Sequence, residues 1–363
     1  MSELYSLKNI GDYTLFLPPT SYCENPDAPK RRAAREAANN AFIDAHKGEK
    51  PRRRISGSFI YAHPPNYKGA DAFRYTEEDW TRELTRLVGY GIDTVIFQAS
   101  MWNELHECYY PSKVFADYKQ WDVVGPMLRA ANKLGLTIYL GGYGSVTCWM
   151  EKLNAGIIES EVKRQYACFE ELYSLYAGQF HGFYFSPESA FTGKRNIELE
   201  NYLGDLYHGL FTMIRGKDPS LKIMMSPATM YYAGVALEEM EAAWSAMFAK
   251  AQPDILAPQD SIGCGCITLD HQDEAFQAWT KLCKKYNIRF WSNVEDFECC
   301  EPYYDETARR AASPERIICQ INNADKYAEK LISWEVLYYT SKELHPYGQR
   351  MTQVIFENAE GEK

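Results

Sequence analysis

An unusual density of carboxylates follows a short apolar run near residue 290. The segment RFWSNVEDFECCE at 289–301 places four acids within seven positions, which are Glu295, Asp296, Glu298 and Glu301. A single acid there would indicate a solvated edge, whereas several acids beside aromatic residues indicate a site. A carboxylate can act as a general base or a nucleophile, and a carboxylic acid can donate a proton. Glu188, in the segment FYFSPE, also follows an apolar run and could supply a second reacting group.

The elements that would position these acids alternate between β-rich and helical stretches after residue 55. The β-rich stretches lie at 56–62, 92–100, 136–144, 180–190, 222–230, 254–263, 288–298 and 330–340. The helical stretches lie at 76–91, 123–134, about 159–177, 198–215, 236–251, 270–286 and 313–327. In the first helix, Thr76 is placed to cap the N-terminus together with Asp79, and Gly91 ends the helix.

This alternation predicts the fold class. Strands that alternate with helices indicate parallel βαβ units, and mostly apolar strands indicate burial on both faces of the sheet. An open doubly wound sheet is the alternative, but eight strand–helix steps predict an α/β fold of the (β/α)8 TIM barrel type. The first strand is not followed by GxGxxG, which argues against a dinucleotide-binding fold.

Three regions follow from this pattern. Residues 1–54 form an N-terminal extension packed on the barrel, with a strand or packed segment at 13–20 and a helix over 30–49. Residues 55–352 form the catalytic barrel, and residues 353–363 form a polar tail.

Composition excludes several classes of protein. A chain of 363 residues with 46% hydrophobic residues can bury a large core. The net charge of −10 argues against a nucleic-acid partner. We find no run of 18 apolar residues and no signal-peptide core at the start, so we expect neither a membrane span nor secretion. The ten cysteines have irregular spacing, which predicts reduced thiols and a cytoplasmic location.

The ends of the predicted strands carry acids, amides and aromatic rings. In a TIM barrel the active site lies at the C-terminal ends of the strands. Aromatic faces stack on sugar rings, while carboxylates and amides bind hydroxyl groups, so we expect a small carbohydrate substrate and no cofactor. The predicted substrate-binding residues are Tyr61, His63, Gln98, Trp102, Asn103, Glu104, Tyr143, Trp149, Tyr231, Gln259, Asp260, Asn293, Glu298 and Trp334.

The predicted catalytic pair is Glu188 and Glu295, at the ends of the fourth and seventh strands. One carboxyl group would protonate the glycosidic oxygen, and the other would be either the nucleophile or the base that activates water. Carboxyl groups about 5–5.5 Å apart favour retention of configuration, and a separation of roughly 6.5–9.5 Å favours inversion. Asp260 is expected to bind a hydroxyl group or to orient Glu295.

The chain also resembles a bacterial family of uncharacterised (β/α)8 barrels that are grouped with glycoside hydrolases under a domain-of-unknown-function label. The matching segments are ISGSFI at 55–60, GIDTVIFQ at 91–98, YPS at 110–112, FYFSPE at 183–188, APQDSIG at 257–263 and WSNVEDFE at 291–298. The resemblance implies a barrel with a carbohydrate-active site, but no known substrate.

A broader likeness is to retaining glycosidases. It implies that Glu188 is the acid/base and Glu295 the nucleophile. Those enzymes usually have Asn, which binds the sugar 2-hydroxyl, where this chain has Pro187. Asn293 or another amide would then bind the 2-hydroxyl, unless the mechanism differs.

Two alternative functions stay open, as does assembly into a homo-oligomer. The first is a metal-dependent hydrolase, because Cys108, Cys148, Cys264, Cys266, Cys299 and Cys300 follow predicted strand ends. With His63 or Asp260 they could bind zinc and activate water, although the chain has no CxxC spacing and adjacent cysteines do not easily bind one ion. The second is a carbohydrate-binding barrel that has no catalytic activity.

Overall fold

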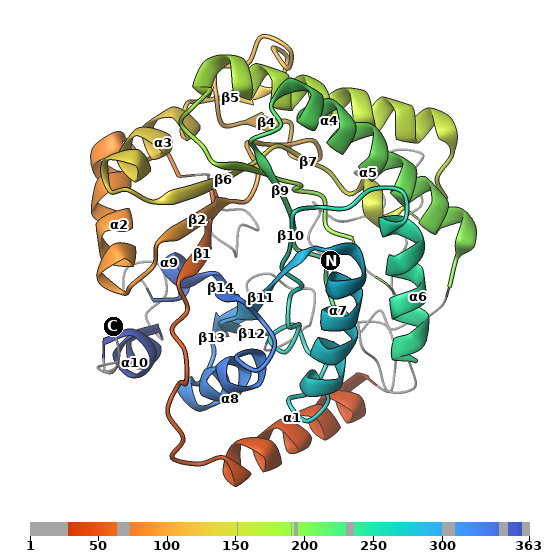
Figure 1. Ribbon diagram of the computed structural model, residues 1–363. Helices are drawn as coiled ribbons and strands as arrows, with labels where there is room; N and C mark the ends of the chain where they lie inside the picture. The colour runs from red at the N-terminus through yellow and green to blue at the C-terminus, as the bar shows by residue number, and fades with distance from the viewer. Residues whose placement is uncertain are drawn as a thin grey trace.

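The computed structural model describes residues 28–63, 73–150, 152–189, 191, 195–229, 236–299, 309–340 and 348–357. Within these ranges, eight parallel strands close into a barrel in the order β1-β14-β11-β10-β9-β8-β6-β2 (Figure 1). The strands are β1 Gly57–Ile60, β2 Thr94–Phe97, β6 Thr137–Gly141, β8 Gly182–Tyr184, β9 Lys222–Met225, β10 Ile255–Leu256, β11 Arg289–Glu295 and β14 Lys330–Trp334. Each lies inside one of the eight predicted stretches, so the predicted TIM barrel is confirmed.

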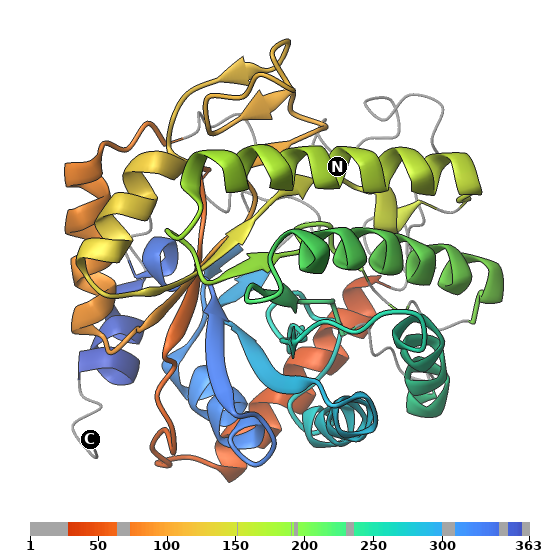
Figure 2. The same cartoon turned by 45° about the horizontal axis from the view of Figure 1, so that its top comes forward.

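Helices surround the barrel on its outer side (Figures 1 and 2). They are α2 Glu77–Gly89, α3 Val124–Lys133, α4 Ala155–Tyr176, α5 Ile197–Lys217, α6 Leu237–Phe248, α7 Gln272–Tyr286, α8 Pro314–Ala324 and the short α9 Val336–Tyr339. The predicted capping box is confirmed, because the Thr76 side chain accepts from the N–H of Asp79 and the Asp79 side chain accepts from that of Thr76.

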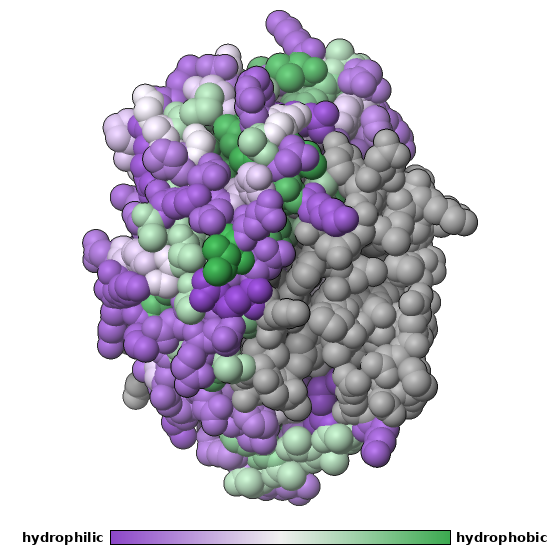
Figure 3. Space-filling view, turned by 90° about the vertical axis from the view of Figure 1, so that its right-hand side faces the viewer, coloured by the Kyte–Doolittle hydropathy of each residue, from purple (hydrophilic) through white to green (hydrophobic). Residues whose placement is uncertain are grey.

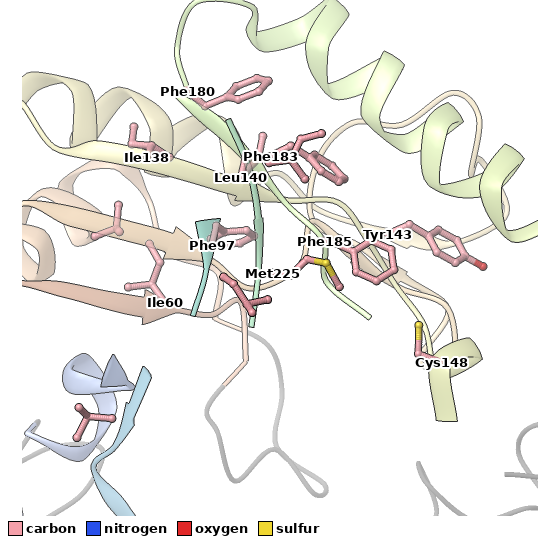
Figure 4. Close-up of a cluster of buried hydrophobic side chains, with 14 of the residues drawn as sticks. Ile60, Phe97, Ile138, Leu140, Tyr143, Cys148, Phe180, Phe183, Phe185 and Met225 are labelled. Carbon is pink, nitrogen blue, oxygen red and sulfur yellow. The ribbon is translucent and has the colours of Figure 1, made fainter. Parts of the chain in front are cut away.

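Two apolar layers lie on the two sides of the barrel wall. The interior is filled by side chains that include Tyr139, Tyr184, Trp291 and Ile332. Residues of the opposite parity face the helices, and Figure 4 shows Ile60, Phe97, Ile138, Leu140, Phe183, Phe185 and Met225 among them. Because side chains alternate along a strand, Asn293 and Glu295 share the inward parity of Trp291.

Two small sheets extend the barrel beyond the C-terminal ends of its strands. One has the order β5-β4-β3-β7, from β3 Met101–Trp102, β4 Glu107–Cys108, β5 Lys119–Gln120 and β7 Tyr143–Gly144. The other pairs β12 Phe297–Cys299 with β13 Arg309–Ala311 in antiparallel fashion. The sequence pattern did not predict either sheet, because strands of two or three residues give no periodic signal.

The N-terminal extension contributes α1 Ala28–Ala45, which lies beside α7 and α8 in both views (Figures 1 and 2). The strand or segment predicted at 13–20 lies outside the described residues. At the other end, α10 Gln349–Met351 leads into a π-helix, Thr352–Glu357. Ile355 is buried there, and Phe356 stacks on Tyr90 with ring centroids 5.0 Å apart, so the predicted polar tail is wrong for residues 353–357.

On the face drawn in Figure 3, hydrophobic residues of the coloured surface are scattered among hydrophilic ones. None of the helices in the described ranges is both long enough and apolar enough to cross a membrane.

Candidate active site

Glu295 ends β11 and is held at both its side chain and its backbone. The residue is 2% exposed, and its Oε2 atom accepts a hydrogen bond from the backbone N–H of Cys264 at 2.8 Å. Its own N–H donates to Asp260 Oδ1 at 3.2 Å. Its carbonyl oxygen accepts from Arg316 Nη2 at 2.9 Å and from Gln320 Nε2 at 3.2 Å. The carboxylate predicted to be catalytic therefore has a fixed position in the barrel wall.

Asp260 supports Glu295 through this contact. Its Oδ2 atom accepts from Gln320 Nε2 at 2.6 Å and from Gln272 Nε2 at 3.4 Å. Burial, followed by the charge of Glu295, raises the pKa of Asp260 to about 7. Both carboxyl oxygens of Asp260 thus accept hydrogen bonds from protein donors, and its expected role, binding a hydroxyl group or orienting Glu295, stays a prediction.

Arg316 and Gln320 are site residues that sequence reasoning missed. They lie one turn apart on α8, and Arg316 Nε donates to Gln320 Oε1 at 3.0 Å. The signal in the sequence was a pair of polar residues at positions i and i+4 in a helix that otherwise turns Ile317 and Ile321 toward the core. Such a pair shows which side of a helix is polar, but it does not show that this side faces β11.

Glu188 lies on the opposite part of the barrel wall from Glu295, beyond β8. Burial and the charge of Glu188 raise the pKa of Tyr184, which also interacts with Gln98. Burial raises the pKa of the Cys148 thiol to about 12, with further contributions from Glu161 and Glu188. The predicted residues Gln98 and Glu188 are thus brought together with Tyr184 near the ends of β2 and β8.

Aromatic residues gather beside Glu295. In the register of β11 with β14, Glu295 is the partner of Trp334. Trp334 Nε1 donates to the hydroxyl of Tyr61, and the two rings meet edge to face with centroids 5.5 Å apart. The ring of Phe297 lies 5.0 Å from that of Trp334. The predicted residues Tyr61 and Trp334 therefore form one aromatic group next to the candidate nucleophile.

Two amides, Asn293 on β11 and Gln259 after β10, meet a serine that follows β9. Asn293 Nδ2 donates to Ser226 Oγ at 3.0 Å, and Gln259 Nε2 donates to the carbonyl of Ser226 at 3.3 Å. Asn293 Oδ1 is buried and has no hydrogen-bond partner among the described residues. Asn293 and Gln259 thus both bind Ser226. This serine lies just after β9, and the sequence did not single it out.

Asn103, Glu104 and Tyr143 form a separate group on the small sheet that contains β3 and β7. Asn103 Oδ1 accepts from the Tyr143 hydroxyl at 2.6 Å, and Glu104 Oε1 accepts from the Val146 N–H at 3.1 Å. Burial raises the pKa of Glu104. Asn103 and Glu104 line a pocket of about 120 Å³ together with His106, Val146, Thr147, Met150, Ile157, Ser160, Glu161 and Arg164. Trp102 lies in β3 and is half-buried.

His63 pairs with an acid that the sequence did not reveal. Its Nε2 atom lies 2.6 Å from Glu107 Oε2, and the Tyr109 hydroxyl donates to the same oxygen at 3.2 Å. Burial acts against ionisation of Glu107, but the hydrogen bond and charge of His63 lower its pKa below the usual range. His63 and Glu107 are 44 positions apart, so no local pattern could have linked them.

The remaining predicted residues lie at the edges of what the structure describes. Glu298 forms an ion pair of 3.2 Å with Arg310 across the β12–β13 hairpin. Trp149 ends a short 3-10 helix, Thr147–Trp149, and its side chain lies outside the described residues, as does all of Tyr231. Their predicted contacts with a sugar stay predictions.

The cysteines that could bind zinc are dispersed. Cys108, Cys148 and Cys266 are buried, Cys264 is partly exposed, and the Cys299 side chain and Cys300 lie outside the described ranges. Burial raises the pKa of Cys108 and of Cys148 to about 12. Over the described part of the chain, no three side chains of His, Cys, Asp or Glu converge in a way that could hold an ion.

Comparison with known proteins identifies a family that matches the chain. The pattern of a family described as "Domain of unknown function (DUF4434)" matches residues 55–344, which confirms the resemblance inferred from the sequence. No curated protein gives a match. Among solved structures, a candidate alpha-L-fucosidase from Bacteroides thetaiotaomicron VPI-5482 has a TM-score of 0.67 at 21% identity, covering 85% of this chain and 96% of that protein.

Two more distant structures also carry glycosidase names. An intracellular xylanase from Thermoanaerobacterium saccharolyticum has a TM-score of 0.49 at 10% identity, covering 82% of this chain and 91% of the xylanase. A beta-D-glucuronidase from Dictyoglomus thermophilum has a TM-score of 0.47 at 10% identity, covering 78% of this chain and 44% of that enzyme. The likeness to the candidate fucosidase, at 21% identity, shows a shared fold.

Proposed function

The chain belongs to the family described as Domain of unknown function (DUF4434), and we propose that its barrel is a glycoside hydrolase in which Glu188 and Glu295 are the reacting carboxyl groups. The observation that carries this proposal is the environment of Glu295. A buried carboxylate on β11 accepts a backbone N–H at 2.8 Å and lies beside the Tyr61–Trp334 aromatic pair. Aromatic rings can stack on a sugar, and a carboxylate held beside them can attack the anomeric carbon of that sugar.

The proposed reaction is a double displacement. Glu188 donates its proton to the glycosidic oxygen while a carboxylate oxygen of Glu295 attacks the anomeric carbon, and the leaving group departs as an alcohol. Water then attacks the same carbon, Glu188 accepts the proton from this water, and Glu295 leaves as a carboxylate. The hydrogen bond from the Cys264 N–H supports this assignment, because a donor to a carboxylate favours its ionised form.

The proposed substrates are short glycosides or oligosaccharides, and the proposed location is the cytoplasm. The cysteines that the structure describes are free thiols, which agrees with a reducing compartment. In the neighbouring structures, the names fucosidase, xylanase and glucuronidase belong to those proteins, and they offer a first panel of sugars to test.

The test is hydrolysis of aryl glycosides and short oligosaccharides by the wild type, Glu188→Gln, Glu295→Gln and the control Glu159→Gln. Glu159 is an exposed residue of α4 that pairs with Lys163 at 2.6 Å. We expect wild-type turnover to survive in the control and to fall by about 10²–10⁴-fold or more in each of the other variants. The anomer formed first, followed by NMR, should match that of the substrate.

Other results would change the assignment. Turnover that survives either substitution would mean that the wrong carboxylate has been chosen, and an inverted product would replace the double displacement by direct attack of water. Saturable sugar binding without any turnover in the wild type would favour the alternative of a non-catalytic carbohydrate-binding barrel.

A further inference from the structure

We propose that helix α1, which lies outside the residues matched by the family, is a working part of the active site because it fixes the loop that holds Glu295. The family match begins at residue 55, whereas α1 spans Ala28–Ala45. The inference rests on the proposed function of Glu295 as a reacting group. It assigns to Asn39 the role of a positioning residue for that carboxylate.

The inner side of the loop at 260–271 is in contact with Glu295. The Cys264 N–H donates to Glu295 Oε2, and a Cβ atom added to Gly263 would lie 3.0 Å from the same oxygen and would collide with the carbonyl of Phe297. The loop is closed on itself, because the Cys266 N–H donates to the Ser261 carbonyl at 2.9 Å and the Gly265 N–H to that of Ile262 at 3.0 Å. A displacement of the loop would therefore carry the Cys264 N–H away from the carboxylate.

The outer side of the same loop is in contact with α1. Asn39 Oδ1 accepts a hydrogen bond from the Leu269 N–H at 2.9 Å. The backbone of Gly265 has a left-handed conformation, with φ +73°. A Cβ atom added there would lie 3.2 Å from the Arg35 guanidinium. Phe42 and Ile43 pack against an apolar cluster formed by Ile262, Ile267, Leu269, Ala275 and Cys319. The loop thus lies between α1 and the end of β11.

A series of hydrogen bonds also connects the Asn39 contact to the backbone of Glu295. The Leu269 carbonyl accepts from Asn323 Nδ2 at 3.1 Å, and the same Nδ2 lies 3.0 Å from Gln272 Oε1. Gln272 Nε2 donates to Asp260 Oδ2 at 3.4 Å, and Asp260 Oδ1 accepts from the Glu295 N–H. Leu269 is held by α1 at its N–H and by α8 at its carbonyl.

This arrangement matters for catalysis because a reacting group must be held close to its productive geometry. A site needs its reacting groups within about 0.5 Å and 10–20° of that geometry, and a displacement of about 1 Å can reduce the rate by about 10²-fold. Loss of the Asn39 acceptor leaves the Leu269 N–H without its partner and loosens the loop. The expected effect is on kcat, because Asn39 contacts the loop from α1 and acts on Glu295 only through that loop.

The experiment compares Asn39→Ala with Asn40→Ala and Asn39→Asp in the full-length chain. Asn40 is the exposed neighbour on the same helix, and Asp at position 39 keeps an acceptor oxygen. For Asn39→Ala we expect kcat to fall about 10–100-fold, KM to stay within about twofold, and amide hydrogen exchange of residues 261–271 to become faster. Asn40→Ala should match the wild type, and Asn39→Asp should restore most of kcat.

Two results would overturn the inference: unchanged exchange of the loop in Asn39→Ala, or an equal loss of kcat in Asn40→Ala. The exchange measurement does not require a substrate. If the wild type hydrolyses nothing, the proposed function fails, whereas faster exchange confined to the loop in Asn39→Ala still supports the contact between α1 and the loop. Unchanged exchange in that case would reject both.

Discussion

The backbone N–H of Glu295 donates a hydrogen bond to Asp260 Oδ1 over 3.2 Å, so the two acids are joined by a contact that does not involve the carboxylate of Glu295. That carboxylate stays bound to the Cys264 N–H. Burial and then the charge of Glu295 raise the pKa of Asp260 to about 7. Asp260 therefore acts on Glu295 through the hydrogen bond that fixes its backbone, and the charge of Glu295 acts on the titration of Asp260.

This relationship predicts the kinetics of Asp260→Asn. The variant keeps the shape of the side chain but places an NH2 group against donors, so kcat should fall at least about tenfold while KM stays within about twofold. Because a pKa of about 7 leaves Asp260 largely protonated on the acidic limb of the profile of kcat/KM against pH, the neutral Asn side chain should not move this limb. Steady-state kinetics from about pH 4 to 8 measure both effects. A rise in KM with kcat unchanged would instead place Asp260 on the substrate.

Arg316 should be important for stability. Its buried guanidinium donates to the carbonyls of Glu295 and Phe297 and to Gln320 Oε1. Arg316→Met keeps the aliphatic stem but removes the donor to these three buried acceptors, and we expect the free energy of unfolding to fall by about 2–5 kcal/mol. Urea unfolding measures this change. Arg310→Met is the matched control, because Arg310 forms an exposed ion pair with Glu298, and its loss should be at most about 1 kcal/mol.

Asp296 should make stability depend on pH. The residue is 1% exposed, and burial raises its pKa to about 7 although Ser333 and Arg316 act in the opposite direction. Between about pH 4, where the unfolded chain loses this proton, and about pH 7, the folded state binds more protons than the unfolded state. Asp296 therefore lowers the free energy of unfolding as pH rises through this window.

Asp296→Asn removes this group from the titration. We expect the variant to unfold with a free energy higher than that of the wild type by up to about 4 kcal/mol at about pH 8, and to show no such gain at about pH 4. Urea unfolding at these two pH values and midway between them gives the comparison, with the exposed Asp117→Asn as a control for the change in net charge. A gain of equal size at every pH would contradict the titration of Asp296.

Gly263 should tolerate no side chain. An added Cβ atom would collide with the Phe297 carbonyl and lie 3.0 Å from Glu295 Oε2. Gly263→Ala should destabilise the fold by about 1–3 kcal/mol and lower kcat by displacing the loop. Gly216→Ala is the control, because a Cβ atom added to this helical glycine would have no neighbour within 4 Å, and the variant should gain about 0.5–1 kcal/mol. Thermal unfolding and hydrolysis assays distinguish the two variants.

The partners of the candidate site show why part of it could not be predicted. Gln320 and Asp260 are 60 positions apart, and Asn39 and Leu269 are 230 positions apart. Hydrophobic periodicity reports only on neighbours within one helix or strand, so it gives no information on which polar residue of α8 or α1 meets which loop. The short sheet around β3 and β7 escaped prediction for a related reason, because each of its strands is too short to show a period.

The order of apolar and helical stretches along the chain was sufficient to predict the barrel and the candidate residues at its mouth. Alternation of apolar strands with amphipathic helices requires a parallel sheet covered by helices, and such a barrel brings the residues after its strands to one end. Glu188 and Glu295 could therefore be selected before the fold was known. The surroundings of Glu295 are known only from the folded protein: they are the Cys264 N–H, Arg316, Gln320 and, through the loop, Asn39. These contacts depend on how separate elements pack in three dimensions, which local sequence patterns do not specify.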